Sequence, residues 1–88
     1  MKFNIDDLKK KLIYRSTYRG TKEMDTLLGL FTKKYINKLT HLELIDLSNL
    51  LDLDDENLYK LNQGINLTIE IKPNKVTKLF QNYDYVSE

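Results

Sequence analysis

Apolar residues recur at the spacing of an α-helix along nearly the whole chain of 88 residues. The pattern is clearest between residues 21 and 37, where apolar side chains fall at i, i+3, i+4 and i+7 and polar ones lie opposite. This stripe consists of Met24, Leu27, Leu28, Phe31 and Tyr35. We therefore predict an amphipathic helix over about residues 21–37.

The N-terminal segment predicts a first helix over residues 5–18. Ile5, Leu8 and Leu12 fall on one face of it, and the lysines between them mostly point elsewhere. The first twelve residues contain two aspartates and no apolar run of about seven residues, so they resemble neither a secretory signal nor a transit peptide.

A third helix is predicted from Thr40 to near Asp52. Thr40 and Glu43 have the spacing of a capping box, which marks a helix start. One side of this helix is formed by Leu42, Ile45, Leu50 and Leu53. Other leucines, Leu44, Leu47 and Leu51, lie off that side. A helix that is apolar around much of its circumference is expected at the centre of a fold.

A fourth helix follows, with Asp54 or Asp55 as its N-cap and Gly64 as its C-terminal stop. Its apolar face consists of Leu58, Leu61 and Ile65. The segment NLTIEIK, residues 66–72, alternates weakly between apolar and polar residues. A single strand would have no partner here, so we interpret it as an extended connector.

Pro73 is predicted to open a fifth helix, because proline suits the first helical position. The stripe of this helix consists of Val76, Leu79, Phe80 and Tyr83. Residues 83–88 are expected to form a flexible tail.

Together these segments predict an all-α fold, a compact bundle of about five short helices in one domain over residues 1–88. No strands alternate with helices, and neither a Walker lysine loop nor a GxGxxG motif occurs, so a nucleotide-binding sheet is not expected.

Composition excludes several classes of site. The chain has no cysteine and one histidine, His41, so a disulfide scaffold, a thiol nucleophile and a cysteine or histidine metal site are not expected. Its net charge of +1 lacks the basic excess of a dedicated nucleic-acid-binding protein. No apolar run approaches the roughly 18 residues that cross a bilayer.

The stretch YRGTKEMD, residues 18–25, joins the first two predicted helices. Gly20 is one of only three glycines, and it suits a turn because glycine reaches left-handed backbone angles without steric cost. Glu23 and Asp25 fall in the first turn of the second helix, where acidic residues complement the helix dipole. These residues could therefore have a purely structural role.

The residues around Gly20 also have the composition of a protein-docking surface. Both arginines of the chain, Arg15 and Arg19, lie here, although the whole chain has twelve lysines. Arginine offers a planar fork of donors that grips carboxylates or carbonyls, which lysine cannot do. The full cluster is Tyr14, Arg15, Tyr18, Arg19, Lys22 and Glu23. Exposed aromatic and arginine residues at a sharp turn favour contact with another protein.

At these residues the sequence resembles a known family. The run LIYRSTYRGTKEMDTLLGLF is similar to the hallmark of the FAD assembly factors of succinate dehydrogenase, small helical proteins also called flavinators. The hallmark is an Arg-Gly followed, after two intervening residues, by Glu, here Arg19, Gly20 and Glu23. A looser match is DENLYKL, where Leu58 and Tyr59 fit and the family's usual proline and tryptophan are replaced.

The resemblance, over about residues 8–65, implies a function. Family members bind the flavoprotein subunit of succinate dehydrogenase, and often that of fumarate reductase, and promote covalent attachment of FAD to a histidine of it. They are not themselves enzymes, and no FAD is expected to stay bound to this chain. The resemblance places such proteins in the bacterial cytoplasm or the mitochondrial matrix. A free monomer is expected.

The expected partner-binding residues are Arg19, Gly20, Glu23, Arg15, Tyr14 and Asp25. Gly20 would let the partner's backbone approach closely, and Arg19 would donate to carboxylates or carbonyls of the partner. Glu23 would accept from a donor on the partner or hold Arg19 in place. Arg15 and Tyr14 would flank the contact.

Three other functions stay open at this point. His41 could act as a catalytic base, and the carboxylates of residues 52–56 could hold a cation, although they lack the glycine and terminal glutamate of an EF-hand loop. The first two helices could form a DNA-binding helix-turn-helix, but nearby acids balance their lysines. An antitoxin-like module that neutralises a small toxin would also use a protein-binding surface.

Overall fold

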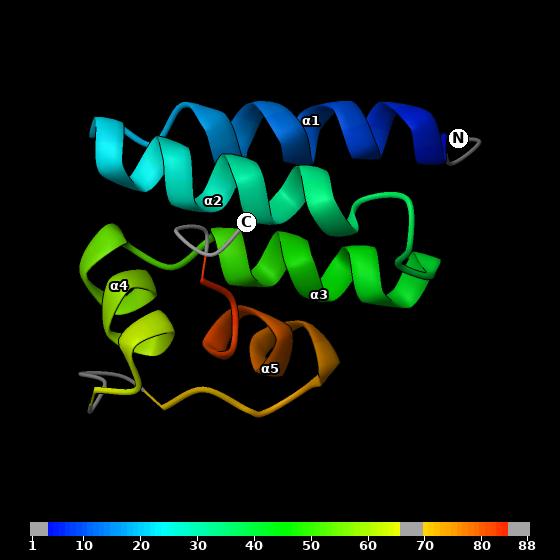
Figure 1. The fold of residues 1–88 in the computed structure, drawn as a ribbon. Helices are drawn as coiled ribbons and strands as arrows, with labels where there is room; N and C mark the ends of the chain where they lie inside the picture. The colour runs from blue at the N-terminus through cyan, green and yellow to red at the C-terminus, as the bar shows by residue number, and fades with distance from the viewer. Residues whose placement is uncertain (1–3, 66–69, 85–88) are drawn as a thin grey trace.

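The described residues, 4–65 and 70–84 of the computed structural model, form five α-helices. They are α1 (Ile5–Thr17), α2 (Lys22–Tyr35), α3 (His41–Leu51), α4 (Asp55–Gln63) and α5 (Lys75–Gln81). Helices α1, α2 and α3 lie one below the next in Figure 1, and α4 and α5 lie beyond α3. Helix α1 packs against both α2 and α3, while α5 packs against α3 and α4. The predicted all-α bundle is confirmed.

Each helix begins at a side chain that accepts a backbone N–H of the first turn, which supplies an acceptor that the helix itself lacks. These N-caps are Asn4, Thr21, Thr40, Asp54 and Asn74. The predicted capping box is present, because the Thr40 N–H donates to Glu43 Oε1 at 2.9 Å and the Glu43 N–H donates to Thr40 Oγ1 at 3.2 Å. The bond from the Thr40 N–H holds the pKa of Glu43 below its ordinary value.

Helix ends follow the sequence to within about two residues: α2 ends at Tyr35, two residues before the predicted end at 37. Gly64 ends α4 in the left-handed conformation, with φ of 71°. Helix α5 starts two residues after Pro73, because Asn74 forms a capping box with Thr77 and takes the N-cap position itself. Residues 66–72 were interpreted as an extended connector. Residues 70–72 have no regular secondary structure, which agrees with this interpretation, and residues 66–69 lie outside the described part.

One core joins all five helices. Phe31 of α2 lies at its centre, with its ring centroid 5.1 Å from that of Phe80 and 5.4 Å from that of Tyr83. Tyr83 is buried, so the expected tail does not include it; residues 85–88 lie outside the described part. Among the described helices, none combines the length and the apolar character needed to cross a membrane.

The expectation that α3 is central because it is apolar around much of its circumference is wrong in part, since one side of it is exposed. Leu44, Leu47 and Leu51, together with Leu50, are the buried residues, whereas Leu42 is 75% exposed. Ile45 is also exposed. Both sets of leucines have helical spacing, so periodicity alone could not choose between them; contact with α1 and α5 decides the orientation. Ile65 was likewise expected inside and is exposed.

Candidate protein-docking site

The connection between α1 and α2 is a tight corner of four residues, 18–21. Helix α1 ends where the Tyr18 N–H donates to the Tyr14 carbonyl at 3.1 Å. Gly20 has φ of 116°, a conformation that residues with a side chain rarely adopt. Thr21 then caps α2 by accepting the Met24 N–H at 3.2 Å. The predicted turn role of Gly20 is therefore confirmed.

Gly20 is also open to the outside. A Cβ built on it would meet no other atom within 4 Å. The glycine is thus required by the backbone angle and not by crowding within this chain. The space beside it is available to another molecule.

Asp25 holds the corner from within. Its Oδ1 accepts the N–H of Arg19 and, at 3.3 Å, the N–H of Gly20. Two successive backbone N–H groups that converge on one carboxylate oxygen fix the peptide planes of the turn. Asp25 was predicted as a partner-binding residue, and the structure brings it to the corner as an internal support.

Arg19 points into the molecule. Its Nε donates to Asp55 Oδ1 at 3.0 Å, its Nη1 to the Leu51 carbonyl at 2.7 Å and its Nη2 to the Leu53 carbonyl at 2.6 Å. Its side chain is only 13% exposed. The predicted direct donation from Arg19 to a partner therefore does not fit this structure, because the C-terminal end of α3 and the start of α4 use these donors.

Arg15 makes a parallel connection one turn earlier on α1. Its Nη1 donates to Ser48 Oγ at 2.9 Å, and its Nη2 donates to the Ser48 carbonyl at 3.3 Å and to Asp52. Its side chain remains 34% exposed, so one face of it is accessible beside the corner. Both arginines thus join the end of α1 to the end of α3.

Glu23 has no such internal role. It is exposed on the first turn of α2, and its carboxylate forms no hydrogen bond or ion pair with residues 4–65 or 70–84. The alternative prediction that Glu23 fixes Arg19 is wrong, because Asp55 does so. Glu23 is therefore an accessible acceptor next to Gly20.

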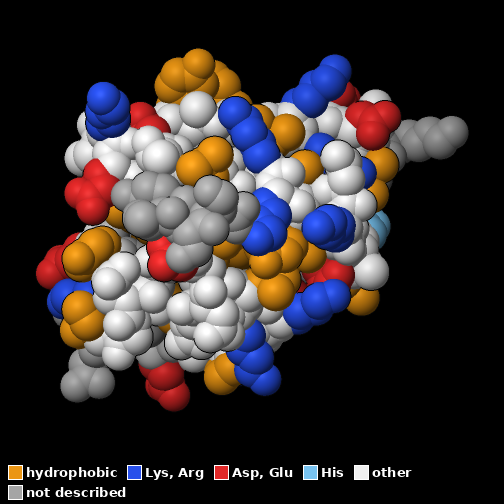
Figure 2. Space-filling view, in the orientation of Figure 1, with side chains coloured by type: hydrophobic (Ala, Val, Ile, Leu, Met, Phe, Trp, Pro, Cys, Tyr) orange, Lys and Arg blue, Asp and Glu red, His pale blue; other side chains and the backbone are white. Residues whose placement is uncertain are grey.

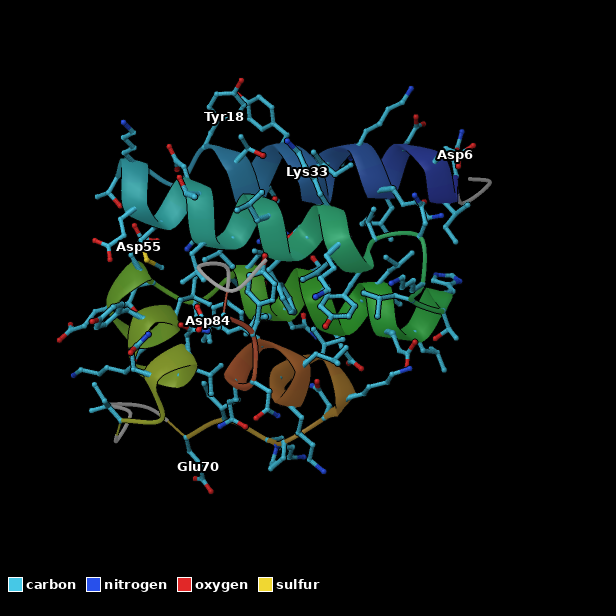
Figure 3. All side chains as sticks on the ribbon, viewed as in Figure 1. Asp6, Tyr18, Lys33, Asp55, Glu70 and Asp84 are labelled. Atoms are coloured by element: carbon cyan, nitrogen blue, oxygen red, sulfur yellow. The ribbon has the colours of Figure 1, made fainter. Side chains whose placement is uncertain are left out.

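Two tyrosines form the most exposed aromatic surface of the corner. Tyr14 is 65% exposed and Tyr18 67%, and their ring centroids are 4.6 Å apart. Figure 3 shows Tyr18 projecting away from the bundle. Both tyrosines belong to the predicted docking cluster, but only Tyr14 was predicted as a partner-binding residue; Tyr18, four residues later, lies on the same side of the helix end.

The other predicted candidates have structural roles. Asp52 pairs with Arg15, Asp55 with Arg19, and Glu56 with Lys60 at 3.1 Å. Asp54 caps α4. Within the described ranges, no three His, Cys, Asp or Glu side chains are grouped to hold a metal ion. His41 is the exposed first residue of α3, as expected for a residue after an N-cap.

An exposed aromatic pair beside a glycine turn favours a protein-binding module, because aromatic side chains anchor many protein interfaces. Comparison with known sequences agrees with this class. The family described as "Flavinator of succinate dehydrogenase" matches residues 10–84. The chain belongs to this family, as the resemblance of its Arg-Gly-x-x-Glu run predicted.

Curated relatives include mitochondrial and bacterial proteins. The protein named "Succinate dehydrogenase assembly factor 2, mitochondrial" of Scheffersomyces stipitis is 47% identical over 49 residues, 56% of this chain and 33% of the relative. Its namesake in Debaryomyces hansenii is 34% identical over 82 residues, 89% of this chain and 58% of the relative. The "FAD assembly factor SdhE" of Acetobacter pasteurianus is 34% identical over 55 residues, 62% of this chain and 50% of the relative.

The matched part of this chain thus spans between a third and three-fifths of the length of these relatives. No solved structure matches the chain at the significance of these sequence matches.

Proposed function

We propose that this protein is an assembly factor that binds the flavoprotein subunit of succinate dehydrogenase and promotes covalent attachment of FAD to it. The observation that carries the proposal is the corner of residues 18–23. Asp25 and Arg19 fix its backbone from within. Gly20, Glu23 and Tyr18 face outward from it, and Tyr14 on the last turn of α1 packs beside Tyr18. Membership of the family described as flavinators of succinate dehydrogenase supports the flavoprotein subunit of that enzyme as the partner.

The chemistry of attachment belongs to FAD and the flavoprotein, and this chain contributes binding and orientation. A rigid corner can hold the flavoprotein with its reacting groups aligned, which lowers the entropic part of the barrier. In this account the protein is not an enzyme and binds no FAD of its own. Gly20 gives room for close backbone approach, Glu23 accepts a hydrogen bond or pairs with a cation, and Tyr14 anchors the contact.

Arg19 and Asp25 have a different part in this function from the one first expected. Because the guanidinium of Arg19 and the Oδ1 of Asp25 bond within the chain, we assign these residues to shaping the corner and not to direct contact with the partner. Arg15, with one face exposed, both supports the corner and borders it. We expect a free monomer, in the cytoplasm of a bacterium or the mitochondrial matrix. The flavoprotein of fumarate reductase is a second expected client.

The test is flavinylation in cells that lack their own assembly factor. The flavoprotein subunit is expressed with each variant, and covalent flavin is measured by its fluorescence after denaturing electrophoresis. Gly20→Arg and Glu23→Ala should abolish the signal while both isolated variants still melt cooperatively. Normal flavinylation with Glu23→Ala would contradict the assignment of this site.

Gly64→Arg is the control for Gly20→Arg. Gly64 also has positive φ, and a Cβ there also meets open space, but its φ of 71° lies in the left-handed region that residues with a side chain can adopt, so its backbone cost is the smaller of the two and the melting temperature of each variant is measured alongside. Equal loss of flavinylation in the two variants would mean that instability alone explains the effect. Recovery of a small toxin instead of a flavoprotein in a pull-down would favour the antitoxin alternative.

A further inference from the structure

A concave surface begins at Glu23, beside the corner. It is a groove of about 580 Å³ between the start of α2, the outer side of α4 and the end of α5. The polar side chains that line it include Glu23, Tyr59, Asn62, Gln63, Gln81 and Asn82. Between α4 and α5 the surface in Figure 2 is mostly white, that is, uncharged polar side chains and backbone. The groove is therefore continuous with the corner and differs from it in chemistry.

The walls of the groove are held in place by one amide. Asn62 Nδ2 on α4 donates to the carbonyls of Phe80 and Tyr83, each at 2.9 Å, and so ties α4 to the end of α5. Gln63 Nε2 donates in turn to Asn62 Oδ1 at 2.9 Å. These bonds fix the width of the groove before any partner arrives, which reduces the ordering cost of binding.

Several polar groups in the groove are still available. Within residues 4–65 and 70–84, the side chains of Glu23, Tyr59 and Gln81 form no hydrogen bond or ion pair. The Asn82 amide uses its Nδ2 on the Lys78 carbonyl, which leaves its Oδ1 as an acceptor. A carboxamide offers donors and an acceptor side by side, which matches the alternating N–H and C=O groups of an extended backbone.

We propose that this groove binds an extended segment of the flavoprotein, with a Lys or Arg of that segment placed against Glu23. An extended segment fits because its backbone groups need partners, whereas a helix satisfies its own. Exposed Tyr59 provides an aromatic contact for the same segment. This inference rests on the proposed function and extends the docking surface from the corner to α4 and α5.

Photo-crosslinking to the purified flavoprotein subunit tests the inference. The photoreactive residue p-benzoylphenylalanine is placed at Gln63 in the groove, at Lys22 on the corner, or at Lys33, an exposed position on the last turns of α2. We expect the first two labels to capture the flavoprotein and the Lys33 label not to. Mass spectrometry should place the Gln63 crosslink in a loop or terminal segment that contains Lys or Arg.

The other outcomes show whether the groove alone fails or the proposed function fails with it. Capture from Lys22 without capture from Gln63 overturns the groove and leaves the corner standing. A Gln63 crosslink to this chain itself, or to a second copy of it, also overturns the groove. Capture from neither position, together with absent flavinylation, overturns both proposals.

Discussion

The guanidinium of Arg19 lies 3.0 Å from the carboxylate of Asp55, a residue 36 positions further along the chain. In Figure 3, Asp55 lies at the start of α4, near the N-terminal end of α2, which follows the corner. This ion pair, together with the bonds from Arg19 to the Leu51 and Leu53 carbonyls, joins the corner to the α3–α4 junction. Two segments resemble the family, one around Gly20 and one around Tyr59. The bonds of Arg19 hold the first segment against the start of α4, the helix that carries the second.

Replacement of Arg19 by Lys should destabilise the protein and distort the corner. One ammonium group cannot reproduce the planar fork that meets two carbonyls and a carboxylate. We expect the free energy of unfolding to fall by about 1–3 kcal/mol, as for buried acceptors that lose their donors. Urea denaturation measures this change. Arg15→Lys, at a more exposed ion pair, should cost less, roughly 0–1 kcal/mol; equal losses would contradict the account.

Replacement of Tyr18 by Ala should weaken partner binding without weakening the fold. Its ring is 67% exposed, so we expect the free energy of unfolding to change by no more than about 0.5 kcal/mol. The affinity for the flavoprotein subunit should fall by about tenfold or more, as for an aromatic anchor at an interface. Calorimetric titration measures the affinity.

Leu42→Ala is the control for the tyrosine variant. Leu42 is the more exposed of the two, at 75%, but lies at the start of α3. We expect its affinity for the flavoprotein to match that of the unchanged protein. A loss from Leu42→Ala as large as that from Tyr18→Ala would show that exposed apolar area, and not the corner, controls binding.

Replacement of Thr32 by Val should stabilise the protein. Thr32 is fully buried, and its Oγ1 has no hydrogen-bond partner in the described part of the chain. Valine has a similar shape and removes the unpaired hydroxyl, so we expect a gain of roughly 1 kcal/mol. Thermal unfolding followed by circular dichroism checks this.

Thr77→Val provides the opposite result at another buried threonine. Thr77 Oγ1 accepts the Asn74 N–H at 2.8 Å in the capping box of α5. Loss of that bond should lower the melting temperature. A rise in melting temperature for both variants would mean that hydroxyl burial, whether paired or not, dominates at these positions.

The helices could be predicted from the sequence because their determinants are local. Thr40 and Glu43 lie three residues apart, and Gly64 ends its own helix, so each signal is complete within one turn. The start of α5 was predicted at Pro73 because proline suits the first helical position. Asn74 is the N-cap instead, because its side chain and that of Thr77 form a capping box.

The location of the site could be predicted from the sequence, but the contacts of its side chains could not. The sequence placed Gly20 and Glu23 on an exposed turn, and the structure agrees. It could not show that Arg19 turns inward, because the acceptors of Arg19 lie more than 30 positions away and are brought to it only by packing of α1 against α3. The groove at α4 and α5 escaped prediction for the same reason.

Amide hydrogen exchange of this protein, alone and saturated with the purified flavoprotein subunit, tests the docking corner most directly. The N–H groups of Lys22 and Glu23 lie in the first turn of α2, where no helical carbonyl can accept them, so they exchange rapidly in the free protein. Our account predicts strong slowing at these two amides and none at the start of α3. Unchanged exchange at Lys22 and Glu23 in a saturated complex would contradict it.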